Sequence, residues 1–214
     1  LGEANVEQLY EAVFNSSISL LDPFSRYSSA EKASRNRERR SGFGGIGVRF
    51  STIPEGARIT EVFEGTPAAR AFLFEGDIIT HVNGQPLADV PRRRIAKMVK
   101  GAVGSTVQLR FVRAKGADPI NMSIRRAQII PPTVYLKHDG GVLFARIKGF
   151  NKRTSKLLSR LLGPVLKHRK NTIRGIVLDL RGNPGGLLSQ AIKVADLFLG
   201  EGRIVSTKGR HPAS

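Results

Sequence analysis

The chain has 214 residues, of which 40% are apolar and none is cysteine. This length suits two modest domains, or one domain and part of another. No apolar run approaches the roughly 20 residues that a membrane-spanning helix needs. The missing cysteines exclude disulfides and thiolate-ligated metal, although they do not identify a compartment. Since the first residue is Leu1, we expect any signal or anchor segment to lie outside this sequence.

The net charge of +18 is concentrated in the second half of the chain. Residues 1–118 contain 17 Lys and Arg against 13 Asp and Glu, whereas residues 119–214 contain 18 against 4. Such a field attracts anionic partners, nucleic acid included. The cations are nevertheless spread through apparent strands and helices, Trp is absent, and no aromatic-interleaved patch could stack bases. A generally basic surface is therefore favoured over nucleic-acid binding.

Residues 1–41 predict a helical N-terminal segment and a connector. Apolar residues at helical spacing form an amphipathic stripe, which consists of Val6, Leu9, Tyr10, Val13 and Phe14. Such a helix suits docking or dimerisation. The polar and charged connector that follows the Asp22-Pro23 turn is consistent with a short second helix.

Residues 42–127 predict one small, mostly β domain. The runs that show alternation or β-branched enrichment are IGVRF, ARITEVF, DIITHVNG and TVQLRFVRA, and Asn83-Gly84 is a strong turn signal. Two helices are expected between these runs. One has Pro67 early in TPAARAFL, and the other runs from a cap at Asp89 to a stop at Gly101.

Residues 128–214 predict the start of an α/β sheet. The prolines of IIPPT, residues 129–133, make a stiff linker because each restricts its own φ and the residue before it. A β-α-β-α pattern follows, with strands over 142–147 and 173–180, helices over 154–170 and 187–199, and then RIVST. The apolar run GIVLDL predicts a strand that is covered on both faces, and Gly163-Pro164 predicts a kink. The fold class is mixed α+β.

The glycine-rich run GFGGIG, residues 42–47, formally satisfies G-x-G-x-x-G. A dinucleotide site needs a strand before this pattern and a helix after it, whereas here a charged connector precedes and VRF follows. Glycine-rich backbone before a strand can instead form a nest of N–H groups that holds a carboxylate, while the strand edge accepts an extended peptide. On the loop alone, an ordinary glycine turn is the simpler alternative.

The run LDLRGNPGGLL places a glycine turn between a strand and a helix. Asn183 can cap the helix and Pro184 suits its first position, while Gly185 and Gly186 let the backbone approach a ligand. Their N–H groups form a potential site for a phosphate or a developing oxyanion, although such a turn is more often a plain connection. For Asp179 a structural role is favoured over catalysis, through pairing with a basic neighbour such as Arg181 or through backbone hydrogen bonds.

Neither a metal site nor a nucleophile stands out. The histidines show no metal-ligand spacing, and they are His81, His138, His168 and His211. No serine lies in G-x-S-x-G, and the Ser-Lys neighbours are expected on the surface, namely Ser155-Lys156 and Ser206 near Lys208. We therefore predict no metal and no cofactor.

The order of the segments resembles that of the carboxyl-terminal processing (tail-specific) proteases. The resemblance is carried by LDPFSRY, GFGGIGVRF, GTPAARAFLFEGDIITHVNGQPL, VGSTVQLRFVR, GIVLDLRGNPGGLLSQAIKVADLFL and IVSTKGR, which together span nearly the whole chain. EGDIITHVNG is common to many PDZ domains, whereas LDLRGNPGGLL after a PDZ domain is specific to this family.

The resemblance implies a role for each segment. Residues 42–127 would form a PDZ domain, a small β-barrel-like fold with two helices, and residues 128–214 an incomplete α/β peptidase core. In the PDZ domain, the carboxylate-binding loop would be Gly45, Ile46, Gly47 and Val48, and the side-chain pocket would be lined by Ile95 and Val99. In the core, the oxyanion-hole backbone would be Gly185 and Gly186. The partners would be protein or peptide C-termini, and a homo-oligomer is one option.

The family cleaves with a serine nucleophile and a lysine base, and both lie beyond the segment that matches IVSTKGR. The resemblance therefore implies a serine endopeptidase whose dyad is outside this chain, so that this stretch alone binds peptides without cutting them. Two or three core strands would also leave one sheet edge and one helix face bare, which favours a longer protein over a domain-swapped or dimer-completed fragment. The alternative is a non-catalytic PDZ peptide-binding protein. The implied location is extracytoplasmic, in the bacterial periplasm.

Overall fold

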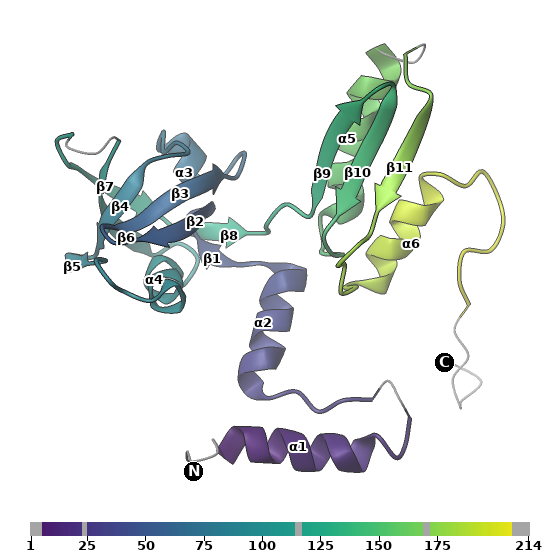
Figure 1. The fold of residues 1–214 in the computed structure, drawn as a ribbon, viewed down its shortest axis with the longest axis horizontal. Coiled ribbons are helices and arrows are strands. Elements are labelled where there is room, and N and C mark those ends of the chain that lie inside the picture. The colour runs from purple at the N-terminus through teal and green to yellow at the C-terminus, as the bar shows by residue number, and fades with distance from the viewer. Residues whose placement is uncertain (1–5, 23–24, 114–116, 169–171, 207–214) are drawn as a thin grey trace. The chain divides into compact units, whose positions relative to one another are not determined.

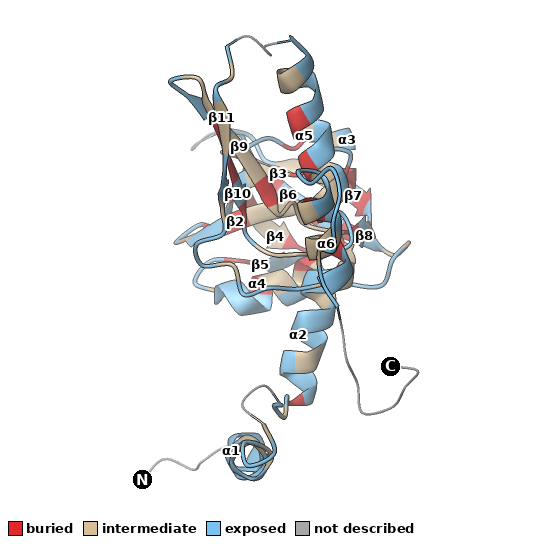
Figure 2. Ribbon diagram, turned by 90° about the vertical axis from the view of Figure 1, so that its right-hand side faces the viewer, coloured by how far each residue is buried: buried red, intermediate tan, exposed pale blue. Residues whose placement is uncertain are grey.

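The computed structural model describes residues 6–22, 25–113, 117–168 and 172–206. The chain divides into two compact units, Leu1–Arg39 and Arg40–Ser214. Helices α1 (Val6–Ile18) and α2 (Ala30–Ser41) confirm the predicted helical segment (Figure 1). Figure 2 shows that both consist mainly of exposed and half-buried residues, and the apolar stripe of α1 is exposed. No described helix is long and apolar enough to cross a membrane.

The β domain is built on the predicted mixture of strands and two helices, and its antiparallel sheet is open, without closing into a barrel. Its strand order is β2-β3-β4-β6-β7, with β5 paired to β4. The strands are β2 (Val48–Ile53), β3 (Gly56–Val62), β4 (Ile78–Val82), β5 (Gln85–Pro86), β6 (Thr106–Val112) and β7 (Ile120–Arg125). Strand β2 therefore lies at an edge of the sheet, where its outer backbone groups can pair with another strand.

A separate two-stranded ribbon joins the two ends of this domain. Strand β1 (Phe43–Gly45) pairs antiparallel with β8 (Ala127–Ile129), and Phe43 lies opposite Ile129. The last strand therefore continues to Ile129, within the run that the sequence assigns to the linker.

Both predicted helices of the domain form. Helix α3 (Pro67–Arg70) has its proline at the first position, as predicted. Helix α4 (Arg92–Val99) starts after Pro91, which occupies the N-cap position. The predicted cap at Asp89 is wrong, because Asp89 has φ +57° and lies in the turn before the helix.

The core of the β domain lies between the sheet and α4. Among its fully buried side chains are residues of β3, β4, β6 and α4, which include Ile59, Ile79, Ile95, Leu109 and Phe111. Burial of side chains of this size contributes about 1.5–3 kcal/mol each. This packing fixes α4 against the sheet beside β2.

The second region confirms the predicted β-α-β-α order. It contains β9 (Val134–Asp139), β10 (Val142–Ile147), α5 (Thr154–His168), β11 (Gly175–Asp179) and α6 (Leu188–Asp196). The sheet order is β11-β10-β9, with β10 and β11 parallel and β9 antiparallel to β10. A parallel pair needs a crossover connection, which α5 provides. Residues 203–206 of RIVST are not in a strand, and Thr207 lies outside the described residues.

One face of this second sheet is covered by helices and the other is not. Along β10 the buried Leu143, Ala145 and Ile147 alternate with the exposed Phe144 and Arg146. Figure 1 shows α5 crossing behind β9 and β10. This covered face carries the second core, which also includes Leu158, Leu162 and Val194.

Strand β11 is less covered than the sequence predicts. Val177 pairs with Phe144 in the parallel register, so both lie on the uncovered face, and they are 44% and 39% exposed. Leu178 and Leu180 are also exposed. The expectation of a strand covered on both faces is therefore wrong for the described residues, because helices pack on one face only and leave Leu178 exposed even on that face, where it pairs with Ala145.

The end of α4 is held by a buried arginine. Arg126 is only 8% exposed. Its guanidinium donates to the carbonyl oxygens of Met98 (3.1 Å) and Val99 (2.9 Å), and to Thr106 O and Ser105 Oγ (both 2.9 Å). The last carbonyls of a helix lack partners within the helix, and Arg126 satisfies two of them.

Replacing this arginine should destabilise the chain strongly. Arg126→Met leaves buried acceptors without donors, so we expect the free energy of unfolding to fall by about 2–4 kcal/mol. Arg125→Met is the matched control, because Arg125 is exposed and donates only to the Gly104 carbonyl. Urea unfolding followed by circular dichroism measures both. Equal losses in the two variants would contradict the assigned role of Arg126.

Candidate functional site: a peptide groove and a glycine turn

A groove of about 520 Å³ lies between the edge strand β2 and helix α4. The strand side consists of Gly45, Ile46, Gly47, Val48 and Phe50, and the helix side of Arg92, Arg93, Ala96, Val99 and Lys100. The predicted loop residues and Val99 thus come together on one surface. Ile95 does not line the groove, because its side chain is fully buried in the core.

The backbone of the loop directs its N–H groups toward the groove side. The Ile46 carbonyl accepts from the Ala68 N–H, and the Gly47 carbonyl accepts from the Phe63 N–H, both at 2.9 Å. In a trans peptide the following N–H points opposite to the carbonyl. The N–H groups of Gly47 and Val48 therefore point away from α3 and β3.

Glycine is required at position 47. Its φ is +91°, and a Cβ there would lie 2.3 Å from the Cβ of Thr66. A side chain would therefore meet both backbone strain and a buried neighbour. The close packing of Gly47 on Thr66 keeps its carbonyl turned inward.

This arrangement can bind the end of an extended peptide. Outward N–H groups in a concave backbone turn favour an anion such as a carboxylate. The open edge of β2 offers main-chain hydrogen bonds to an added strand, and Ile46, Phe50 and Val99 give apolar surface for a side chain.

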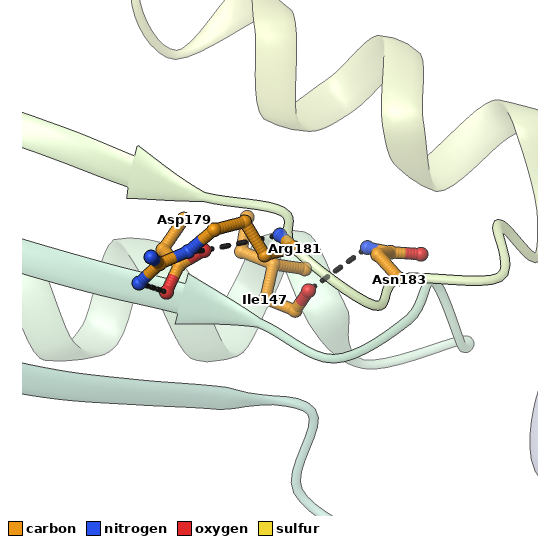
Figure 3. Close-up of polar contacts among 4 residues, drawn as sticks. All are labelled: Ile147, Asp179, Arg181 and Asn183. Carbon is orange, nitrogen blue, oxygen red and sulfur yellow. Dashed lines mark hydrogen bonds and ion pairs between the residues drawn. The ribbon is translucent and has the colours of Figure 1, made fainter.

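The second candidate site is the turn that follows β11, and Figure 3 shows its polar contacts. The Asp179 carboxylate accepts from Nε and Nη2 of Arg181 (both 2.9 Å) and from the Arg181 backbone N–H (3.0 Å). These hydrogen bonds from the arginine side chain and backbone lower the pKa of Asp179 from 3.8 to about 2. Asp179 thus stays ionised and shapes the turn, which is a structural role.

Asn183 anchors the turn and does not cap the helix as predicted. Its Nδ2 donates to the Ile147 carbonyl at 2.9 Å, at the end of the neighbouring strand (Figure 3). Its Oδ1 accepts from the Gly185 N–H at 2.7 Å. Helix α6 has Leu187 as its N-cap residue, so Pro184 also lies before the helix.

The two glycine amides of the turn differ. The Gly185 N–H is occupied by Asn183, whereas its carbonyl accepts from the Phe150 N–H at 3.0 Å. Because the next N–H in a trans peptide points the opposite way, the Gly186 N–H is directed away from Phe150. Both glycines are exposed. Their oxyanion role stays a prediction, and Gly186 has the better placed amide.

Gly186 also needs to be glycine. Its neighbours Gly185 and Leu187 both bond to the Phe150 backbone, which brings the two chains together. A Cβ on Gly186 would lie 2.1 Å from the Phe150 carbonyl oxygen. The close approach of the two backbones therefore sets the position of the turn.

No cluster of three or more potential metal ligands occurs among the described residues. His211 and Lys208 lie outside the described residues. Ser155 Oγ donates to Gln190 Oε1 at 3.0 Å, so it holds α5 to α6.

Comparison with known proteins agrees with this division of the chain. Residues 44–124 match the PDZ domain, and residues 141–214 match peptidase family S41. The carboxy-terminal-processing protease of Bartonella bacilliformis is 34% identical over 206 residues, which are 95% of this chain and 48% of that protein. The chain is therefore similar to the carboxyl-terminal processing proteases over nearly its whole length.

Other proteins that the chain matches are also covered only in part. A protein of Staphylococcus epidermidis described as a probable CtpA-like serine protease is 35% identical over 87% of this chain and 37% of its own length. The photosystem II D1 C-terminal processing protease is similar over 86% of this chain and 52% of that chain, with 20% identity and a TM-score of 0.49. This chain thus spans about half the length, or less, of the relatives it matches.

The close approach at Gly186 predicts a sharp difference between two alanine variants. Gly186→Ala should lower the free energy of unfolding by roughly 2–4 kcal/mol, because backbone strain adds to the clash with Phe150. Gly182→Ala is the control, since Gly182 also has positive φ (+71°) but no atom within 4 Å of the added Cβ. It should cost only about 1–2 kcal/mol. Urea unfolding measures both, and equal losses would exclude the clash.

The carboxylate of Asp179 gives a pH prediction. Its folded-state pKa lies below the model-peptide value, so the pair contributes stability above pH 3.8 that is lost as the pH falls through about 2. Arg181→Met should raise the pKa of Asp179 toward 3.8, as measured by carboxyl ¹³C NMR. Arg174→Met is the control, because Arg174 donates to the Gly140 carbonyl. An unchanged Asp179 pKa in Arg181→Met would contradict the assigned cause.

Proposed function

We propose that this chain is the substrate-binding PDZ domain and the first part of the catalytic core of a serine endopeptidase that cleaves proteins near their C-termini. The observation that carries the proposal is the loop at Gly47 and Val48. Its outward N–H groups stand beside an open strand edge and an apolar groove, as recognition of a chain end requires. Similarity to the carboxyl-terminal processing proteases and to peptidase family S41 supports the link to cleavage.

In this proposal the substrate tail adds to the sheet as a strand beside β2. Its terminal carboxylate accepts hydrogen bonds from the Gly47 and Val48 N–H groups. Its last side chain enters the groove near Ile46 and Val99. Since the carboxylate sits at the start of β2, the tail runs antiparallel to that strand.

For the cleavage step, the Gly186 N–H is the proposed donor to the oxyanion. The nucleophilic serine and the base lysine would come from sequence that follows Ser214 in the complete protein, as the family resemblance implies. The lysine accepts the serine proton, and the serine oxygen attacks the scissile carbonyl. The proton then passes to the leaving amine, and water hydrolyses the acyl-enzyme. The lysine must be neutral to act, and burial favours that form.

A second candidate is a peptide-binding protein without peptidase activity. The observation that favours it is that all the groove residues lie within the described chain, and binding needs no nucleophile. For the peptidase, we also propose an extracytoplasmic location, in the bacterial periplasm. Detection of the protein in a periplasmic extract, with a cytoplasmic marker as control, tests that location.

Carboxylate capture predicts a difference between two peptides. A ten-residue peptide with a free C-terminus should bind the chain at least about tenfold more tightly than its amidated twin, because charge-assisted hydrogen bonds to N–H groups are lost in the amide. Fluorescence anisotropy measures both affinities. Gly47→Ala should abolish the difference, whereas Gly65→Ala should keep it, since no atom lies within 4 Å of a Cβ on Gly65. Equal affinity for the acid and the amide would overturn the proposal.

Cleavage is tested on the product of the complete gene. That protein should cut a substrate with a free C-terminal tail, while the 214-residue chain should bind the same substrate and leave it intact. In the complete protein, the candidate nucleophilic serine and base lysine follow Ser214. Replacing either of them by alanine should abolish cleavage and preserve binding. Binding without cleavage by the complete protein would favour the second candidate.

A further inference from the structure

The walls of the groove carry basic side chains and no acidic ones. Arg49, Arg92, Arg93 and Lys100 line it, and no Asp or Glu does. The domain does contain acidic residues, because residues 42–127 include seven Asp and Glu residues. Charge is therefore segregated, with the acidic residues of this domain outside the groove lining.

Helix α4 and its C-cap residue Lys100 supply three of these four cations. Its sequence is RRRIAKMV, in which every charged residue is basic. All three arginines of its first turn are exposed, and Arg92 and Arg93 line the groove, whereas Arg94 does not. Arg49 contributes less, because it forms an ion pair with Glu61.

Arg92 is held across the groove. Its Nε donates to the Phe50 carbonyl at 3.3 Å, and its guanidinium lies 5.6 Å from the centre of the Phe50 ring. These contacts bring the cation from α4 to the outer edge of β2. A strand added to that edge would therefore pass beside a guanidinium group.

The position of Arg92 along β2 decides which part of a tail it meets. An antiparallel tail with its carboxylate at Gly47 and Val48 runs past Phe50, two residues further along β2. With about 3.3 Å per strand residue, Arg92 would stand about 7 Å from the carboxylate. It would thus face side chains about two or three residues before the C-terminus. A carboxylate there would meet an exposed cation, so the attraction should weaken as the salt concentration rises.

We propose that the groove selects protein tails that carry Asp or Glu two or three residues before an apolar C-terminal residue, and that Arg92 and Arg93 recognise these carboxylates. This proposal rests on the proposed function, since it takes the groove as the site for C-termini. It adds a substrate class, namely acidic tails with an apolar end.

Three ten-residue peptides test the preference on the 214-residue chain. They share a C-terminal valine with a free carboxylate and differ only at the second and third residues before it, which are both Glu, both Gln or both Lys. By fluorescence anisotropy at about 50 mM salt, we expect the Glu peptide to bind roughly 5–20-fold more tightly than the Gln peptide, and the Lys peptide to bind most weakly. At about 500 mM salt the Glu-to-Gln ratio should fall toward one.

Three single variants assign the preference to residues. Arg92→Gln and Arg93→Gln should each lower the Glu-to-Gln affinity ratio at least about threefold, because each removes a positive charge that lines the groove. Arg94→Gln is the matched control, since it removes the same charge from the same helix turn outside the groove, and it should keep the ratio. The Glu-to-Gln affinity ratio is measured because a variant that weakens binding of both peptides equally leaves this ratio unchanged.

The possible outcomes distinguish the preference for acidic tails from the capture of the C-terminal carboxylate. Equal binding of the Glu and Gln peptides, with the free acid still preferred over the amide, overturns the acidic preference alone. Equal binding of acid and amide overturns carboxylate capture itself. A fall of the ratio in Arg94→Gln as large as in Arg92→Gln overturns the assignment to the groove residues.

Discussion

The peptide plane is the constraint on which both candidate sites depend. Wherever a carbonyl is fixed inward by a hydrogen bond, the next N–H must face outward. Ile46 and Gly47 are fixed in this way against α3 and β3, and Gly185 is fixed against Phe150. Each site therefore gains a directed amide from packing on its opposite side, and needs no side chain to provide it.

The rest of the β domain keeps this geometry in place. The β1–β8 ribbon ties the loop to the end of the domain, and the core fixes α4 as the opposite wall of the groove. Arg126 then holds the carbonyls at the last turn of α4. The binding surface thus depends on buried contacts that lie behind it, which is typical of preorganised sites.

Much of this arrangement could be predicted from the sequence, because it follows from local signals. Alternating runs predicted β2, β3, β4 and β6, and strand β10 matches its predicted bounds. Strand β9 was not predicted, since VYLKHD mixes charge with weak alternation and depends on pairing to β10. The caps at Asp89 and Asn183 were wrong. Helix α4 begins after Pro91, and the Asn183 side chain bonds to Ile147 and Gly185 instead of capping α6.

The site was predictable in part. Glycine patterns located the loop and the turn, but they could not show that Asn183 occupies the Gly185 amide, which depends on how the turn folds back. Ile95 and its neighbour Ala96 are adjacent on α4, and only the rotation of the helix decides which one faces the groove. The basic residues of α4 were visible as charge, yet their place beside Phe50 required the structure.

The half-covered sheet has a practical consequence for handling this chain. The exposed side chains of Phe144 and Val177 form a hydrophobic strip on the uncovered face of the sheet. Among the described strands, β11 also has no partner on its outer edge. Unpaired strand edges can pair with edges of other molecules, so such chains aggregate at high protein concentration. This polypeptide should therefore be kept dilute and cold, with a mild detergent that covers the hydrophobic strip.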